Sequence, residues 1–135
     1  MFKPKKTKYT KEQKGKNFKK INTGQGILKQ KRNQIYLKAL SSGRVSEKNL
    51  LACKQTINKI IKKQGRLNIH IFANTPITKK PTEIRMGKGK GAIDSWVCRV
   101  KPGTILFEIN IKFKIIGFKA FKLIKNKLPI KTKII

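Results

Sequence analysis

The sequence predicts a two-layer α+β domain that follows an extended basic arm. Apolar residues recur at helical spacing in two segments and alternate with polar residues in others, whereas residues 1–25 are rich in lysine and sparsely apolar. Helices mixed among strands that are mostly linked as hairpins are typical of two-layer α+β domains. Because 135 residues suit one domain and 38% of them are hydrophobic, we expect residues 26–135 to form a single domain with a modest core.

The arm, residues 1–25, is punctuated by glycines, and we expect it to be solvated alone and ordered only against a partner. Two aromatic residues, Tyr9 and Phe18, interrupt its charges. Packing against the domain is the favoured role of both rings, and stacking on exposed bases is the alternative.

The segments after the arm predict strand and then helix. Residues 26–40 mix aliphatic residues with lysines and indicate one or two strands, which the Ser-Ser-Gly run at 41–43 interrupts. Ser46 is a good N-cap, Glu47 in the first turn suits the helix dipole, and Gly65 is predicted to be the C′ residue that ends the helix. The apolar residues at helical spacing are Leu50, Leu51, Ile57, Ile60 and Ile61.

Residues 67–72 alternate in polarity and predict a strand with Leu67, Ile69 and Ile71 on its apolar face. Prolines then bracket residues 74–81, which we interpret as an irregular connection.

Two further strands, 82–85 and 93–100, are predicted to form a hairpin with a long glycine-rich tip. A Lys-Pro-Gly turn then leads into a strand over 104–109. A second helix is expected to end near Pro129, with a last short strand over 130–135. One side of the second hairpin strand carries Trp96, Cys98 and Val100, and the second helix is indicated by Ile116, Ala120, Phe121, Ile124 and Leu128.

The charge of the chain points to a polyanionic partner. Lysine and arginine total 35 against five acidic residues, a formal net charge of +30 whose self-repulsion opposes compaction. Nucleic acid is the commonest such partner, and a composition dominated by lysine favours phosphate and shape recognition over base readout. A membrane-surface role is the competing interpretation, but no long basic amphipathic helix dominates the chain and no apolar run approaches the roughly 18 residues that span a bilayer.

The run Arg85-Met86-Gly87-Lys88-Gly89-Lys90-Gly91 is the most informative stretch of the sequence. Its alternate glycines can adopt positive φ and thin the backbone, while the cations remain free to reach a groove lined by phosphate. A solvated flexible loop is the alternative interpretation.

The sequence offers little support for catalysis or metal binding. The loop is not a P-loop, because Lys90 is followed by glycine, and the five acidic residues show no paired-carboxylate spacing. Cys53, Cys98 and His70 cannot supply the four ligands of a structural zinc site. We therefore predict a non-enzyme without cofactor or metal, and His70 on a strand face without chemical function. Both thiols are interpreted as small core residues, with a disulfide or redox pair as the alternative.

The chain resembles the bacterial-type ribosomal large-subunit protein sixteen family over nearly its whole length. The run from Pro76 to Gly91 carries the most specific part of the resemblance. The matching runs are Pro4-Lys5-Lys6-Thr7-Lys8-Tyr9, Lys14-Gly15-Lys16-Asn17, Gly43-Arg44-Val45, Lys63-Gln64-Gly65-Arg66, Pro76-Ile77-Thr78-Lys79-Lys80-Pro81, Arg85 to Gly91, Trp96, Lys101-Pro102-Gly103, Ala120-Phe121-Lys122-Leu123 and Leu128-Pro129-Ile130-Lys131-Thr132.

The resemblance implies an antiparallel sheet backed by two helices, present as one copy within the ribosome and embedded in large-subunit rRNA among neighbouring ribosomal proteins. It implies that the arm penetrates rRNA, and that residues 85–91 point toward the aminoacyl-site tRNA, with the peptidyl-site tRNA as a further contact. The rRNA-binding residues expected on this basis are Lys3, Lys5, Lys6, Lys8, Lys14, Lys16, Arg44, Lys63 and Arg66. A DNA-compacting protein and a free RNA-binding assembly factor or chaperone are the alternative functions, but neither explains residues 76–91.

Composition also bears on the source. Abundant lysine, isoleucine and asparagine with scarce alanine are expected of an AT-rich coding sequence. The chain begins at the N-terminus typical of the family, so no added transit peptide is visible. Both observations fit an organelle-encoded protein, in a mitochondrion rather than a plastid, with the cytoplasm of an AT-rich bacterium as the alternative.

Overall fold

The structure, a computed structural model, describes residues 2–13 and 33–135, and within them it confirms the predicted α+β class. In these two described ranges, two helices accompany seven strands that pair antiparallel throughout. The elements are β1 (Gln34–Ala39), β2 (Gly43–Ser46), α1 (Glu47–Ile61), β3 (Gly65–Ile69), β4 (Thr75–Lys79), β5 (Ala92–Val100), β6 (Ile105–Ile111), α2 (Lys114–Lys125) and β7 (Thr132–Ile134).

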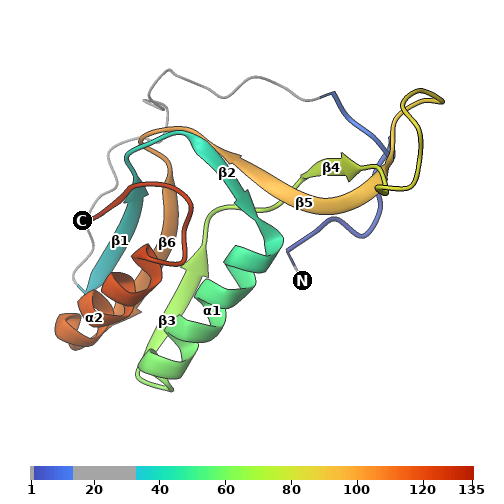
Figure 1. Cartoon of the computed structure of the whole chain (residues 1–135). Helices are drawn as coiled ribbons and strands as arrows, with labels where there is room; N and C mark the ends of the chain where they lie inside the picture. Colours follow the sequence, from blue (N-terminus) through green and yellow to red (C-terminus); the bar gives the residue numbers. More distant parts are fainter. Residues whose placement is uncertain (1, 14–32) are drawn as a thin grey trace.

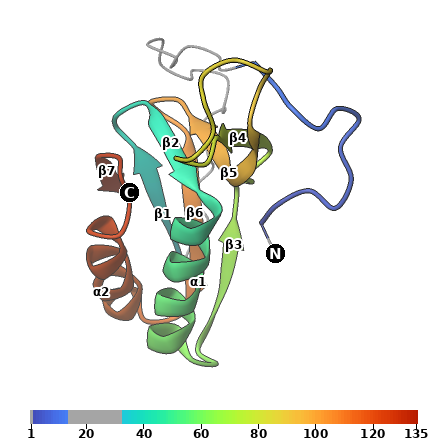
Figure 2. The same ribbon diagram turned by 45° about the vertical axis from the view of Figure 1, so that its right-hand side comes forward.

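The strands form two sheets rather than one. Four strands lie in the order β3-β6-β1-β7, and the other three in the order β2-β5-β4. Both helices pack against one face of the four-stranded sheet, while the three-stranded sheet extends away from them (Figures 1 and 2). The core therefore lies between the helices and the larger sheet. Its fully buried members include Leu37, Ile57, Phe107, Ile109 and Phe121.

The first helix forms where the sequence predicts it. The Ser46 hydroxyl accepts a hydrogen bond from the Asn49 amide at 3.2 Å, and Glu47 occupies the first turn, as expected of an N-terminal cap. The predicted C-terminus is wrong in detail, because the helix ends at Ile61, Lys62 takes the positive φ of 53°, and Gly65 begins β3. The buried face also differs from the prediction. It is made by Leu50, Cys53, Ile57 and Ile61, whereas Leu51 is exposed.

The partner of β5 is the main error of the sequence prediction. Residues 82–85 form no strand, and β4 pairs with β5 instead, with Pro76 opposite Trp96. Proline is tolerated because β4 lies at the edge of its sheet, where a missing amide hydrogen need not cost a ladder bond. The connection between the two strands therefore spans residues 80–91.

Two further short strands lie next to the helices in the sequence, β2 before α1 and β7 after α2. β2, which the sequence prediction missed, lies directly after the Ser-Ser-Gly run and pairs with β5. β7 confirms the predicted last strand and pairs with β1. The second helix is also confirmed, with Ala120, Phe121 and Ile124 buried, although Leu128 is buried just beyond its end.

The beginning of the arm packs onto the domain. The Phe2 carbonyl accepts a hydrogen bond from the Ala73 amide at 3.1 Å, and the Phe2 ring packs against the core with the Lys54 ammonium 5.7 Å from its centroid. The prediction that Tyr9 packs against the domain is wrong, because the residue is 68% exposed. The rest of the predicted arm, with Phe18, and the start of the 26–40 strand segment lie outside the described residues. No helix in the described part of the chain is long and apolar enough to cross a membrane.

Candidate nucleic-acid interface

The glycine-lysine loop, residues 80–91, projects from the end of the three-stranded sheet (Figure 1). Residues 81–90 are all exposed, and Met86 is 99% exposed. Gly87 and Gly89 adopt positive φ angles of 105° and 86°, and no described atom outside their own chain neighbours lies within 4 Å of a Cβ built on either. The glycines at the tip are therefore required by backbone conformation rather than by packing, as predicted.

Gly91 has a different role at the base of the loop. A Cβ atom on this residue would lie 2.6 Å from the Lys79 carbonyl oxygen, so the absence of a side chain allows the ends of β4 and β5 to approach. Lys88, between the two tip glycines, takes a positive φ of 51° and is exposed.

The arm runs alongside this loop and contacts it directly. The Lys11 ammonium donates to the Lys90 carbonyl at 2.7 Å, and the Lys90 ammonium donates to the Glu12 carbonyl. Arg99 on β5 donates from Nη2 to the Gln13 carbonyl at 3.1 Å. Two segments that the sequence analysis treated separately thus form one basic surface, which we call the arm–loop surface: residues 3–13 with 80–91.

The structure groups some of the predicted RNA-binding residues and separates others. Lys5, Lys6 and Lys8 are exposed on the arm, in the stretch before residues 11–13 that contact the domain, and Lys3 is half-buried. Lys63 and Arg66 are exposed at the opposite end of the domain, around the turn between α1 and β3 (Figures 1 and 2). Arg44 is half-buried on β2. Lys14 and Lys16 lie outside the described residues.

Sequence reasoning missed a polar cluster on the larger sheet. The His70 Nε2 atom lies 2.8 Å from Oε2 of Glu108, a carboxylate on β6 that is only 8% exposed. Asn68 Nδ2 donates to the other oxygen at 3.4 Å. Tyr36 lies opposite Glu108 on β1, and its pKa is raised by burial and by the nearby negative charge. Alternation already placed residues 68 and 70 on the polar face of their strand, but only the register identifies Glu108 as their partner.

The two thiols are free and buried, as predicted. Burial raises the pKa of Cys53 to about 11 and also raises the pKa of Cys98. Both are therefore protonated near neutral pH and unsuited to nucleophilic or metal chemistry. Within residues 2–13 and 33–135, no three His, Cys, Asp or Glu side chains form a group that could hold a metal ion.

Comparison with known proteins identifies the family. The family model described as ribosomal protein L16p/L10e matches residues 4–135. The large ribosomal subunit protein uL16 of Blochmanniella pennsylvanica is 43% identical over 136 residues, which cover all of this chain and 98% of the relative. The proteins of the same name from Acinetobacter baylyi and Chelativorans sp. are each 42% identical over 135 residues, which cover all of this chain and 96% of each relative. The chain therefore belongs to the ribosomal protein L16p/L10e family and is a structural protein rather than an enzyme.

Proposed function

We propose that the chain, a structural protein of the large subunit of a bacterial-type ribosome, binds large-subunit rRNA beside the aminoacyl-tRNA site and helps to position tRNA during translation. The observation that carries this proposal is the arm–loop surface. It combines a thin, fully exposed backbone with closely spaced cations at one end of the domain.

The two parts of the surface are suited to different contacts. Arm lysines such as Lys5, Lys6 and Lys8 are exposed and act on phosphates as point charges, which favours strong, sequence-independent attachment to rRNA. Gly87 and Gly89 leave the backbone of the loop tip without side-chain bulk at alternate positions, so the backbone can approach RNA closely while Arg85 and Lys88 supply charge. We assign rRNA attachment to the arm and tRNA contact to the loop tip.

Lysine and arginine at the opposite end of the domain extend the rRNA contact. Lys63 and Arg66 are both exposed, three positions apart in the sequence, and they lie at the opposite end of the domain from the loop, so they cannot share the groove that the loop enters. A domain with cations at both ends suits a protein surrounded by rRNA and neighbouring ribosomal proteins, present as a single copy in each subunit.

The alternative for the loop is that it fills a crevice of rRNA without meeting tRNA. Purified ribosomes carrying Lys88→Ala distinguish the two roles. Slower aminoacyl-tRNA accommodation with normal subunit composition supports tRNA positioning, and normal accommodation contradicts it. The rRNA-binding part is tested separately, because a subunit protein remains with the large subunit during sedimentation at high salt, whereas a free assembly factor or chaperone dissociates.

The compartment is a separate proposal. The AT-rich composition supports a mitochondrial ribosome, with a plastid or a bacterial cytoplasm as alternatives, and the relatives named above come from bacteria. Fractionation of the source cells distinguishes these compartments. Recovery of the chain with mitochondrial ribosomes supports the proposal, and recovery only with cytoplasmic ribosomes of a bacterium contradicts it.

A further inference from the structure

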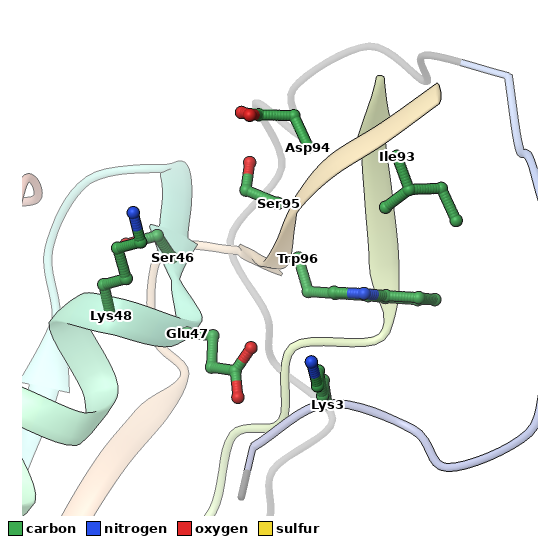
Figure 3. Close-up of a pocket in the computed structure, with 8 residues that line it drawn as sticks. All are labelled: Lys3, Ser46, Glu47, Lys48, Ile93, Asp94, Ser95 and Trp96. Atoms are coloured by element: carbon green, nitrogen blue, oxygen red, sulfur yellow. The ribbon is translucent and has the colours of Figure 1, made fainter. Parts of the chain in front are cut away.

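A hollow of about 490 Å³ opens where the arm, the start of α1 and β5 meet (Figure 3). Its volume lies within the range of about 300–1,000 Å³ typical of small-molecule pockets. Three separate segments contribute to its wall, so it is a product of the fold and not of one loop. The lining residues are Lys3, Ser46, Glu47, Lys48, Ile93, Asp94, Ser95 and Trp96.

Trp96 supplies an aromatic wall to this hollow. It is the only tryptophan of the chain, and it is half-buried, packing in part against the core while also lining the hollow. The next residues along β5, Val97 and Cys98, are buried. Trp96, the largest side chain of β5, is by contrast only partly buried, so part of its ring remains accessible at the hollow. A partly accessible indole is a stacking platform for a planar ligand.

The hollow also contains two of the five acidic residues of the whole chain, Glu47 and Asp94. Among the described residues, the hydrogen bonds and ion pairs of the structure leave both carboxylates without a partner. In Figure 3, Glu47 points from the start of α1 toward the space beside Trp96 and Lys3. A carboxylate accepts hydrogen bonds and repels phosphate, so RNA seated at this spot must present hydrogen-bond donors there. The ribose 2′-hydroxyls and the N–H groups on base edges are such donors, and of the two only a base can also stack on Trp96.

We propose that the hollow holds one guanine turned out of the rRNA, stacked on Trp96 and hydrogen-bonded to the Glu47 carboxylate. Guanine presents two adjacent donors, N1–H and the N2 amino group, which match the two oxygens of a carboxylate. Lys3 and Lys48 at the same hollow neutralise the phosphates on either side of the base. This inference rests on the proposed rRNA binding and adds a base-specific contact to a surface that otherwise recognises phosphate.

The fluorescence of the full chain tests the proposal directly, because Trp96 is its only tryptophan. Guanosine monophosphate and uridine monophosphate are titrated in about 1 M salt, where the screening length is about 3 Å and phosphate contacts are suppressed. We expect saturable quenching by the guanine nucleotide with a dissociation constant about tenfold lower than for the uracil nucleotide, the size of one good base-edge contact. Quenching that does not saturate, or that is equal for the two nucleotides, overturns the proposal.

Two variants with the same change in net charge separate the specific contact from a change in charge. Glu47→Gln should lose the preference for guanine while the far-ultraviolet circular dichroism remains unchanged. Asn126→Lys raises the net charge by the same one unit at an exposed position after α2, outside both the hollow and the arm–loop surface, and should keep the preference. Retained preference in Glu47→Gln overturns the assignment of that residue.

Failure of this inference is distinguishable from failure of rRNA binding. Incorporation of the same wild-type protein into large subunits is measured in parallel by sedimentation. Normal incorporation without nucleotide-dependent quenching contradicts only the proposed guanine site. Loss of incorporation contradicts the proposed function itself.

Discussion

Gly91 lies so close to Lys79 that a Cβ atom at position 91 would be 2.6 Å from the Lys79 carbonyl oxygen, whereas a Cβ at Gly89 would meet open space among the described residues. Gly91→Ala should therefore force the ends of β4 and β5 apart and lower the free energy of unfolding by about 1–3 kcal/mol, the range of a clash or strained backbone. Chemical denaturation measures this change in the free energy of unfolding. An unfolding midpoint equal to that of the wild type would show that the strand ends separate without cost.

Gly89→Val tests the loop tip without disturbing its base. The φ of 86° at this position disfavours a β-branched residue, so the tip must change conformation, but the loop is exposed and the domain should remain folded. We expect a change in global stability within about 0.5 kcal/mol and slower peptide synthesis by ribosomes that carry the variant. Ribosomes with unchanged elongation rates would argue that the tip conformation is irrelevant to translation.

Lys88 and Lys90 should behave differently although both lie in the loop. Lys88→Ala removes an exposed cation and should slow aminoacyl-tRNA accommodation with stability changed by no more than about 0.5 kcal/mol. Lys90→Ala removes the donor to the Glu12 carbonyl and should also release the arm, which is visible as increased motion of the Lys11 and Gln13 amides in NMR relaxation. Equal arm dynamics in the two variants would contradict this division.

Binding to isolated rRNA should depend steeply on salt. If about ten phosphates are neutralised, the logarithm of the affinity should fall with the logarithm of salt concentration at a slope of about −7 to −9. Filter binding across a salt series measures the slope, and a value near −2 would contradict a phosphate-dominated interface. Deletion of residues 1–20 should make this slope less steep, because fewer phosphates are then neutralised. Because Phe2 packs against the core, the deletion should also lower stability slightly, whereas the sequence alone predicted an arm that contributes little to the core.

Ile57→Asp should prevent stable packing of α1. The side chain is fully buried, so an unpaired charge there should cost several kcal/mol, about 3 or more, whereas the control Ile57→Val should cost about 0.5–1.5 kcal/mol. Thermal and denaturant unfolding measure both variants. A near wild-type midpoint for Ile57→Asp would mean that this face of the helix is not in the core.

The Cys53 thiol should contribute a pH dependence in the alkaline range. Its pKa is raised by burial from 9.0 to about 11, so the protonated form stabilises the fold. That contribution is fully present below pH 9 and is lost as the pH rises toward 11, at up to about 1.4 kcal/mol per pH unit. The difference in alkaline slope between the wild type and Cys53→Ala isolates it from other titrating groups. Identical slopes would show that the thiol ionises as readily in the fold as in the unfolded chain.

Local signals predicted the parts of the structure that local chemistry determines. The cap at Ser46 and the spacing of Leu50, Ile57 and Ile61 were sufficient to place α1. β2 has only four residues without alternation, and its partner lies about fifty positions later in the chain, so no local pattern indicates it. β4 was hidden by its proline, which is harmless only because the strand lies at a sheet edge, a fact of topology.

The same limit applies to the candidate site. The composition and spacing of residues 85–91 predicted an exposed basic loop with positive φ angles, which follow from glycine itself. The contact of Lys90 with Glu12 joins residues 78 positions apart, and that of His70 with Glu108 joins residues 38 apart. Such pairs depend on the register of strands and on the path of the arm, neither of which a single sequence encodes locally.

Lys11 attaches the arm through its own side chain, but the two contacts at Glu12 and Gln13 leave the arm freer to vary than the residues that bind it. On the arm side, Glu12 and Gln13 offer only main-chain carbonyl oxygens, which every amino acid possesses. On the opposite side, Lys90 and Arg99 must supply long side chains with donors at their ends. The arm can thus change its residues at these positions without losing its attachment, whereas the domain must keep its two cations. A saturation mutagenesis map should accordingly be permissive at 12 and 13 and restrictive at 90 and 99.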